Sequence, residues 1–368
     1  MPPKPKKMSK KIIIIGQGII GACTAYTLAR AAPDYEIVSI AAHPIASGAT
    51  ASGASWGWVN AHTDNDEEYF NFRNASRLMW HDLIDELPKL AAQISPSLVF
   101  DLSDDAMKTT QAHHADWGYP IALVERAQIL EHLSLFRGAP DLALFTQGEV
   151  AVETELAAHH LLERSGATKV IAQVHALIPH GSQIKAVMTD QGPIAADHVI
   201  LAAGHGSPDI LRSVGVEYAL DQSFGLIVRT QPVQKFLATM IMGMDYHVRQ
   251  CRDGSMLIGG AFDQHQTSGI DYERAAQSLC AAVETAFDLD AVGMEKLVID
   301  RFTIGKRVLP YGGRPQIGRV GHYENLISLA MHGGVTNAPI AAKTASDLVL
   351  GQPRCAYSTP FNFTRIRP

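Results

Sequence analysis

The sequence predicts an α/β protein in two interlocked parts, and three observations support this. The chain has 368 residues, of which 46% are hydrophobic and 18% charged, so it can bury a large core and is too long for one small module. A strand, a glycine-rich turn and a helix follow one another near the N-terminus. From about residue 169 onward, short apolar runs separated by turn residues predict many further strands.

Charge and cysteine usage exclude several classes of protein. Lys and Arg number 31 against 37 Asp and Glu, and a net charge of −6 lacks the basic surface of a general nucleic-acid binder. Cys23, Cys251, Cys280 and Cys355 lie far apart and form no CxxC pair, so we expect free thiols in a cytoplasmic protein. Without an HExxH motif or a Cys/His cluster, no metal site is expected. Residues 1–8 predict a basic disordered tail, and no apolar run is long enough to span a membrane.

The first ordered unit is a strand, a turn and a helix. Residues 12–15 are four isoleucines, which favour a strand that is buried on both faces. The turn is the sequence GQGIIG at 16–21, and residues 22–32 have a helical composition that ends before Pro33. Residues 36–40 predict the second strand, which completes a unit of the size of a βαβ crossover.

The glycine spacing in this turn is typical of a dinucleotide-binding site. Gly16 permits the tight turn, Gly18 lets a pyrophosphate approach the backbone, and Gly21 lets the helix pack close to the strand. The N–H groups at the start of the helix would face the phosphate charge. A βα turn with chance glycines is the alternative. The acidic residue expected at the ribose is missing, because Ala41 occupies its place, and His43 or a backbone group would have to substitute.

The rest of the chain alternates helical and strand patterns. Helical composition or spacing predicts helices at 66–92, 125–132, 153–165, 272–287 and 338–350. Apolar or alternating runs predict strands at 169–174, 176–179, 184–189, 197–204, 225–231, 246–251, 255–260 and 326–330. Small residues also dominate three distant segments, at 48–57, 202–206 and 333–334, which is unusual for ordinary loops.

Four separated blocks carry a family resemblance that covers nearly the whole chain. They are the turn at 16–21, the small-residue loop at 48–58, the stretch at 192–204 and the C-terminal stretch at 305–336. Together they resemble the FAD-dependent D-amino-acid oxidase superfamily, and within it the glycine oxidase and sarcosine oxidase-like group. A cysteine tether of the sarcosine oxidase-like kind has no counterpart between Cys280 and Cys355, so the resemblance implies non-covalent FAD.

The resemblance also implies which residues bind FAD. In the family, the small-residue loop passes the pyrophosphate and reaches the flavin, and glycines before the last helix touch the flavin ring. One extended ligand would explain why small residues recur at three distant turns, and the last helix would point its positive end at the flavin. The implied cofactor-binding residues are Gly16, Gly18, Ile19, Ile20, Gly21, Ala49, Thr50, Ser52, Ser55, Trp56, Gly57, Trp58, Val174, Ala203, Gly204, Gly333, Gly334, Val335 and Thr336.

Four residues are candidates for the substrate side. Arg307 aligns with the arginine that holds the substrate carboxylate in glycine oxidase-like members, and its planar fork suits that ligand. Strand alternation places His247 and Arg249 on one face, which in the resembling enzymes looks into the substrate cavity. His332 precedes the flavin-touching glycines and would contact the ring or the substrate. A surface arginine, a solvated strand face and a structural histidine are the respective alternatives.

These features predict a Rossmann-type FAD-binding domain interlocked with a substrate domain built on an antiparallel sheet. The FAD-binding domain is expected to be discontinuous, at 9–57, 149–222 and 300–368. The substrate domain is expected at 58–148 and 223–299, with its sheet from about 223 to 299.

The expected reaction is oxidation of a small amine or amino acid, with hydride transfer from Cα to flavin N5 and an imine that hydrolyses. Electrons would pass to oxygen or to another acceptor. Three alternatives stay open: an FAD-dependent 2-hydroxy-acid oxidase or dehydrogenase, a nicotinamide dehydrogenase, and a flavin-binding assembly protein that has lost catalysis. Ala41, and the pair Gly312-Gly313 where the family often has Asp-Gly, favour the last of these.

Overall fold

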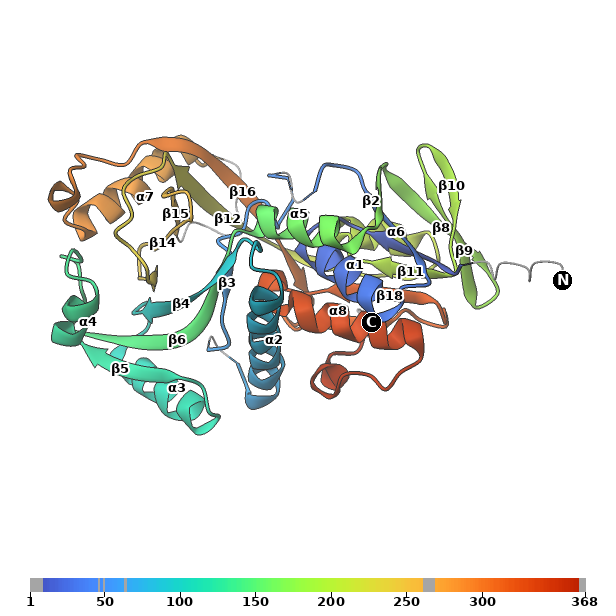
Figure 1. Ribbon diagram of the computed structural model, residues 1–368, viewed down its shortest axis with the longest axis horizontal. Coiled ribbons are helices and arrows are strands. Elements are labelled where there is room, and N and C mark those ends of the chain that lie inside the picture. Colours follow the sequence, from blue (N-terminus) through green and yellow to red (C-terminus); the bar gives the residue numbers. More distant parts are fainter. Residues whose placement is uncertain (1–8, 46, 49, 63–64, 261–268, 364–368) are drawn as a thin grey trace. The chain divides into compact units, whose positions relative to one another are not determined.

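The chain forms two compact units. The computed structural model describes residues 9–45, 47–48, 50–62, 65–260 and 269–363 (Figure 1), so the predicted tail at 1–8 lies outside the described residues. Unit 1 consists of Met1–Ser47, Glu155–Asp221 and Val308–Pro368, and unit 2 of Gly48–Thr154 and Gln222–Arg307. The predicted boundaries differ from these at 48–57, 149–154, 222 and 300–307, which all belong to unit 2.

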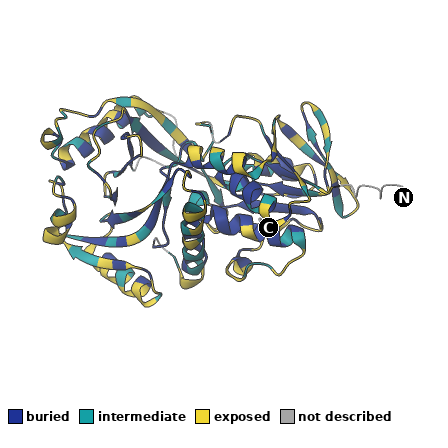
Figure 2. Cartoon of the chain, in the orientation of Figure 1, coloured by how far each residue is buried: buried dark blue, intermediate teal, exposed yellow. Residues whose placement is uncertain are grey.

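Unit 1 is built on a sheet that is parallel except at one edge. Its strands are β1 (Lys11–Ile15), β2 (Glu36–Ala41), β7 (Thr168–Ile171), β11 (His198–Leu201), β17 (Gln316–Arg319) and β18 (Leu326–Ala330). Within the described residues their order is β17-β18-β11-β1-β2-β7, with only the β17–β18 pair antiparallel. The isoleucines of β1 are buried, as predicted, and β1 pairs with β2 and β11 on its two edges; Figure 2 colours the chain by burial.

The helices of unit 1 pack on this sheet and on each other. Helix α1 (Ile19–Ala31) connects β1 to β2 and packs against α8 (Gly334–Leu350), as Figure 1 shows. Helix α8 begins at Gly334 and not at 338 as predicted. In the small-residue segment 333–334, Gly333 is therefore the N-cap of α8 and Gly334 is its first residue. The other elements are α5 (Thr154–Ser165), η1 (Gly204–Gly206), α6 (Ser207–Arg212), η3 (Ala356–Phe361) and an antiparallel sheet of β8 (Val174–His180), β9 (Gln183–Thr189) and β10 (Gly192–Ala195).

Unit 2 is built on a larger sheet than the sequence predicts. Its strands are β3 (Trp58–Val59), β4 (Ala92–Val99), β5 (Ile121–Glu125), β6 (Leu142–Val152), β12 (Leu220–Thr230), β13 (Met240–Met242), β14 (His247–Gln250), β15 (Met256–Gly260) and β16 (Ile299–Pro310). In the part of the chain that the structure describes, the order is β16-β12-β15-β14-β13-β4-β6-β3, with β5 on β6. The expected sheet at 223–299 was therefore too small, because strands at 58–152 complete it.

Four helices flank the sheet of unit 2 within the described ranges. They are α2 (Glu67–Glu86), α3 (Asp104–Asp116), α4 (Arg126–His132) and α7 (Tyr272–Ala286), with a short η2 (Asp290–Val292). Helix α2 starts where predicted because the Asp66 side chain accepts the N–H of Tyr69 at 2.9 Å, a standard N-cap. Helix α7 packs against β15 through an apolar face that includes Val283.

Candidate functional site

The turn after β1 requires glycine at two positions. Gly16 has φ +118° and donates its N–H to Ile40 O at 2.7 Å, and a Cβ there would lie 2.2 Å from Ala202 O. A Cβ on Gly21 would lie 1.9 Å from Gly16 O, so only glycine lets α1 start this close to the strand. Gly18 is the N-cap of α1 and has an extended backbone. These are the properties that the GxGxxG motif predicts.

Two further predicted segments lie beside this turn within unit 1. Ala202 donates its N–H to Ile15 O at 2.8 Å, so residues 203–204, which follow β11, lie near the end of β1. A Cβ on Gly334 would lie 3.2 Å from the Ile20 side chain, so α8 starts close to α1. Because β1, β11 and β18 run parallel, their carboxyl ends share one edge, where open α/β sheets bind ligands.

The residues at this edge fit the phosphates of a dinucleotide. Helix α1 begins after Gly18 and α8 begins after Gly333, which is left-handed at φ +64°. Neither helix has an acidic side chain in its first turn, so the partial positive charge of each N-terminus is not offset there. Ile19 is buried at the start of α1, while Val335 and Thr336 form the first turn of α8.

Two predicted residues contribute differently from the rest of this group. Val174, at the start of β8, is buried in the hydrophobic core of unit 1 with Ile40 and Val187. His332 is exposed, and its carbonyl oxygen accepts a hydrogen bond from Asn337 Nδ2 at 3.3 Å. The structure therefore places the backbone of His332 at the start of α8.

The small-residue loop at 48–57 belongs to unit 2, where its own contacts shape it. Thr50 and Ser55 each accept a backbone N–H from within the loop at 3.1 Å through their hydroxyl groups. Gly57 has φ +74°, and a Cβ there would lie 1.9 Å from the last carbonyl oxygen of β6. Of the other predicted loop residues, Ser52 is half-buried and Ala49 lies outside the described residues.

Two tryptophans follow in this loop and join a histidine. Trp56 is buried and donates its indole N–H to Leu257 O at 3.2 Å. Its ring meets the Trp58 ring edge-on at 5.5 Å and the His247 ring at 4.8 Å between centroids. The three rings therefore form one continuous aromatic row, with Trp58 half-buried at its end.

Arg249 is buried beneath this row and binds the backbone. Its Nε donates to Trp56 O at 2.6 Å, and its Nη2 donates to Val152 O at 2.9 Å. Tyr246 and Val248 point into the hydrophobic core on the other face of β14, as the predicted alternation requires. These bonds favour a positioning role for Arg249, which fixes the loop in place.

His247 and Arg307 lie over glycines of two neighbouring strands. A Cβ on Gly259 of β15 would lie 2.0 Å from His247 Nε2, and a Cβ on Gly225 of β12 would lie 3.1 Å from Arg307 Nη2. In the register of β12 and β15, Gly259 pairs with Ile227, two residues from Gly225, so both glycines lie on one face of the sheet and make room for the imidazole and the guanidinium. Arg307 also donates from Nη1 to Ser223 Oγ at 3.1 Å.

The environment of these side chains sets their charge. Burial, and then the charge of Arg307, lower the pKa of His247 to about 4. Burial also lowers the pKa of Arg307 from its very high ordinary value. At neutral pH the structure therefore combines a neutral imidazole with a guanidinium cation.

Replacing Gly259 with alanine is expected to displace His247 without unfolding the protein. The new methyl group would collide with the tip of a side chain that can rotate, and not with backbone. We expect kcat/KM to fall roughly tenfold or more while the thermal midpoint changes little. The measurement is steady-state kinetics of Gly259→Ala, His247→Ala and the double variant. If Gly259→Ala acts through the imidazole, the double variant is no worse than His247→Ala, whereas additive losses would contradict this.

Several residues at this site were missed in the sequence analysis. Ser223, Gly225 and Gly259 line Arg307 and His247, and glycine within a strand pattern is a signal of close approach that could have identified the last two. Glu149 is completely buried on β6 and was also missed. A single acidic residue next to an apolar run was its only signal in the sequence.

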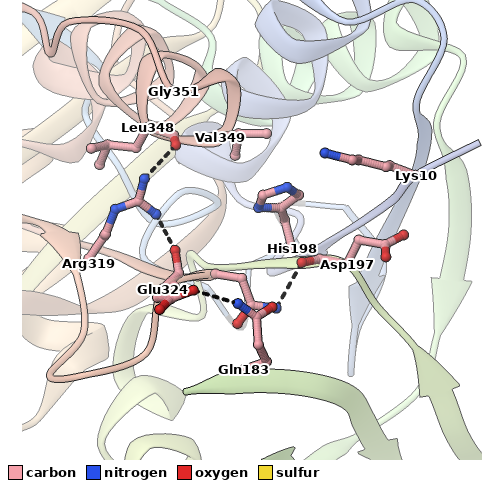
Figure 3. A pocket seen from close by; sticks show the side chains of 10 residues that line it. Lys10, Gln183, Asp197, His198, Arg319, Glu324, Leu348, Val349 and Gly351 are labelled. Atoms are coloured by element: carbon pink, nitrogen blue, oxygen red, sulfur yellow. Dashed lines mark hydrogen bonds between the residues drawn. The ribbon is translucent and has the colours of Figure 1, made fainter. Parts of the chain in front are cut away.

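A separate hollow of about 590 Å³ lies in unit 1 (Figure 3). It is lined by Lys10, His198 and Asn325, which stand at the amino ends of β1, β11 and β18, and by Arg319. Arg319 donates to Leu348 O at 2.9 Å and to Glu324 O, as the dashed lines show. Ligands of open α/β sheets bind at the carboxyl ends, so this hollow is at the wrong edge for the cofactor.

The described residues offer neither a metal site nor a membrane-spanning helix. They contain no group of three or more His, Cys, Asp and Glu side chains that could bind a metal ion. In the same residues, no helix combines the length and the apolar composition that crossing a bilayer requires.

The class of protein follows from unit 1. Its sheet is parallel except at one edge, its strand β1 is followed directly by an obligatory glycine, and helix α1 begins in the same turn. These features define a dinucleotide-binding protein of the Rossmann type. The second unit contributes an arginine and a neutral histidine beside an aromatic row.

The chain belongs to the FAD dependent oxidoreductase family (DAO), whose model matches residues 11–348. It is 23% identical over 363 residues to the glycine oxidase of Pseudomonas putida KT2440, covering 94% of this chain and 95% of that protein. An L-amino acid deaminase from Proteus vulgaris that lacks its insertion sequence superposes with a TM-score of 0.85 at 16% identity, covering 100% of this chain and 97% of that one. Glycine oxidase from Geobacillus kaustophilus superposes with a TM-score of 0.83 at 18% identity, covering 98% and 100%.

These comparisons confirm the predicted family, the α/β fold and FAD as cofactor. The protein is an FAD-dependent enzyme of the amino acid oxidase or dehydrogenase type. The nicotinamide alternative is wrong, because the matched family uses FAD. The assignment of individual residues to cofactor and substrate remains a prediction.

Proposed function

We propose that this enzyme oxidises a small amino acid or amine at Cα, with unit 2 providing the substrate contacts. When bound, FAD would supply the hydride acceptor for this oxidation, and the imine product would hydrolyse to an oxo product and an amine or ammonia. The observation that carries the proposal is the placement of Arg307 beside His247, next to the aromatic row. The relationship to a glycine oxidase supports an amino acid as substrate.

Arg307 would hold the substrate carboxylate. A guanidinium offers two parallel N–H donors to a carboxylate, which gives both charge and direction. The Ser223 hydroxyl that accepts one of its N–H groups is neutral, so this contact does not cancel the positive charge. Burial strengthens an ion pair formed here, because less water screens it.

His247 would orient the amine end of the substrate. Its neutral imidazole can accept a hydrogen bond from an amine N–H and adds no positive charge to repel it. If the amine arrives neutral, no side-chain base is needed. The Trp56 ring, held by the Arg249–Trp56 O bond, would limit the space beside Cα.

FAD would be held without a covalent bond. Cys23, Cys251 and Cys280 are buried, and burial raises the pKa of Cys251 and Cys280, which keeps these thiols protonated and unreactive. Denaturation with acid should therefore release all the flavin into solution, and flavin that stays with the precipitated protein would contradict this proposal.

The reaction is tested by anaerobic bleaching of the flavin colour in the purified holoenzyme. The screen covers D-amino acids, L-amino acids, N-methyl amino acids and 2-hydroxy acids. We expect bleaching by a member of the first three classes, with one amine or ammonia released for each flavin reduced. Bleaching only by hydroxy acids, without ammonia, would support the 2-hydroxy-acid alternative and overturn the proposal. Repeating the reaction in air, with peroxide measured, separates an oxidase from a dehydrogenase.

A further inference from the structure

A completely buried carboxyl group lies beside the aromatic row of unit 2. Glu149, on β6, accepts a hydrogen bond from the Trp58 indole N–H on Oε2 and another from the Tyr119 hydroxyl on Oε1 at 2.7 Å. His62 Nε2 lies 3.5 Å from the same Oε1 atom. The neighbours come from β3, from the segment after it and from the segment before β5, so the cluster exists only in the folded chain.

Apart from Tyr119 and His62, the charged and titratable side chains around Glu149 contact other atoms. From α2, Arg77 and His81 contact the carbonyl oxygen of Gly148 at 2.5 and 2.8 Å. Arg73, also on α2, donates to the backbone and side-chain oxygens of Asn60 at 3.0 and 2.8 Å. From α3, His114 contacts a carbonyl oxygen of its own helix at 2.8 Å. The indole and the phenol donate hydrogen bonds to the carboxyl group, and the buried Ser97 hydroxyl also interacts with it.

This cluster changes its charge near neutral pH. Burial raises the pKa of Glu149 to about 7, although hydrogen bonds from Tyr119, Ser97 and Trp58 and the charge of Arg77 oppose the shift. Burial lowers the pKa of His62 to about 3, so this imidazole stays neutral. As the pH rises through 7, Glu149 changes from a neutral acid to a carboxylate, while the histidine beside it does not respond.

The two forms hold the Trp58 indole differently. A carboxylate accepts a charge-assisted hydrogen bond, which is about twice as strong as one to a neutral acid. In the neutral form, the proton on Oε1 can be donated to His62 Nε2 instead. We propose that Glu149 is a positioning residue whose carboxylate form fixes the Trp58 ring against Trp56, and thereby the aromatic row that ends at His247. The link to substrate rests on the proposed function, whereas the link to Trp58 does not.

The link to Trp58 is tested by ¹⁹F NMR of the holoenzyme labelled with 5-fluorotryptophan. The chain has four tryptophans, and the resonance lost in Trp58→Phe identifies Trp58. We expect its shift to titrate with a midpoint near pH 7 in the wild type and to stay constant in Glu149→Gln, which keeps an oxygen acceptor but cannot ionise. Trp80, which is buried in α2, serves as the internal reference.

A matched control removes a different buried acid. Glu153, just after β6, accepts the N–H of Arg252 at 3.0 Å and has no assigned role in the site. In Glu153→Gln the Trp58 resonance should titrate as in the wild type. A titration that persists in Glu149→Gln, or no titration in the wild type, would overturn the proposal. If Glu149→Gln does not fold, Tyr119→Phe, which removes one donor to the carboxyl group, should raise the midpoint, and an unchanged midpoint would overturn the proposal as well.

The link to substrate is tested by the pH profile of kcat/KM. Between pH 6 and pH 8 we expect the wild-type value to rise roughly tenfold more than that of Glu149→Gln, as the fraction of ionised acid rises. The substrate ammonium group contributes equally in both proteins, and the flavin content should be the same. If the pH profiles of kcat/KM of the wild type and Glu149→Gln run parallel while the ¹⁹F titration is as expected, Glu149 positions Trp58 but does not affect catalysis. If no candidate substrate bleaches the flavin, the proposed function fails, and the ¹⁹F result still decides on Glu149.

Discussion

Gly21→Ala is expected to abolish FAD binding by breaking the fold around the turn. A methyl group at this position would lie 1.9 Å from Gly16 O, a backbone atom that cannot rotate away. Helix α1 must then move off β1, which costs about 3 kcal/mol through overpacking. The shift also removes the N-terminus of α1 from its place beside Gly18. The measurements are the flavin-to-protein ratio after purification and the thermal midpoint of the apoprotein, both of which should fall.

Substitutions of two other glycines distinguish an effect on the stability of the fold from an effect on FAD binding. Gly18 has φ −71° and ψ −179°, which any residue adopts, so Gly18→Ala should leave the apoprotein midpoint unchanged while FAD affinity falls. Gly181, in the β8–β9 turn, has φ +60° with no atom within 4 Å of an added Cβ, so Gly181→Ala should cost about 1 kcal/mol and keep its flavin. Full flavin content in both Gly18→Ala and Gly21→Ala would remove this turn from the cofactor site.

Arg307→Ala is expected to lower kcat/KM by roughly a hundred- to a thousandfold, because it removes the partner of a partly buried carboxylate. Flavin content should not change, since Arg307 is not among the residues expected to bind FAD and its side chain lies against Ser223 and Gly225. Arg307→Lys should fall between the wild type and the alanine variant, because an ammonium keeps the charge but loses the planar fork. The measurement is steady-state kinetics with the substrate that the bleaching screen identifies.

The same substitution has a readout that does not depend on turnover. The charge of Arg307 contributes to the lowered pKa of His247, so Arg307→Ala should raise that pKa from about 4 toward its ordinary value. Histidine NMR titration measures this shift. As a control, Arg301, on the same strand, is half exposed and pairs with Asp300 at 2.9 Å, so Arg301→Ala should change neither quantity. Normal kinetics in Arg307→Ala would exclude Arg307 from the site.

The elements that the sequence predicts best are those whose signals are local. The isoleucine run and the glycine turn at 12–21 are found as β1 and the start of α1, because a buried β-branched strand and a backbone with positive φ each depend on a few adjacent residues. Helix α7 at Tyr272–Ala286 also matches its expectation at 272–287, since one apolar face per turn is a property of the segment itself.

The strands of unit 2 before residue 152 were missed for the opposite reason. Strand β4 has the sequence AQISPSLV, with a proline and a break in register near Ser95, and it pairs with β6, about fifty residues further along the chain. Neither strand shows clean alternation, because β6 is covered on both sides over much of its length. Long-range pairing of this kind leaves little trace in the local pattern.

The sequence by itself determined the class of the cofactor site. The spacing of Gly16, Gly18 and Gly21 after a buried strand permits one kind of turn, and the resemblance of four blocks led to FAD. Only the tertiary structure decided what the polar side chains contact. In the folded chain, Arg249 donates hydrogen bonds to backbone carbonyl groups, and His247 lies over Gly259. Glu149 accepts hydrogen bonds from Trp58 and Tyr119. The reason is physical: a side chain's role depends on partners that strand order and register bring to it, and those partners lie far away in sequence.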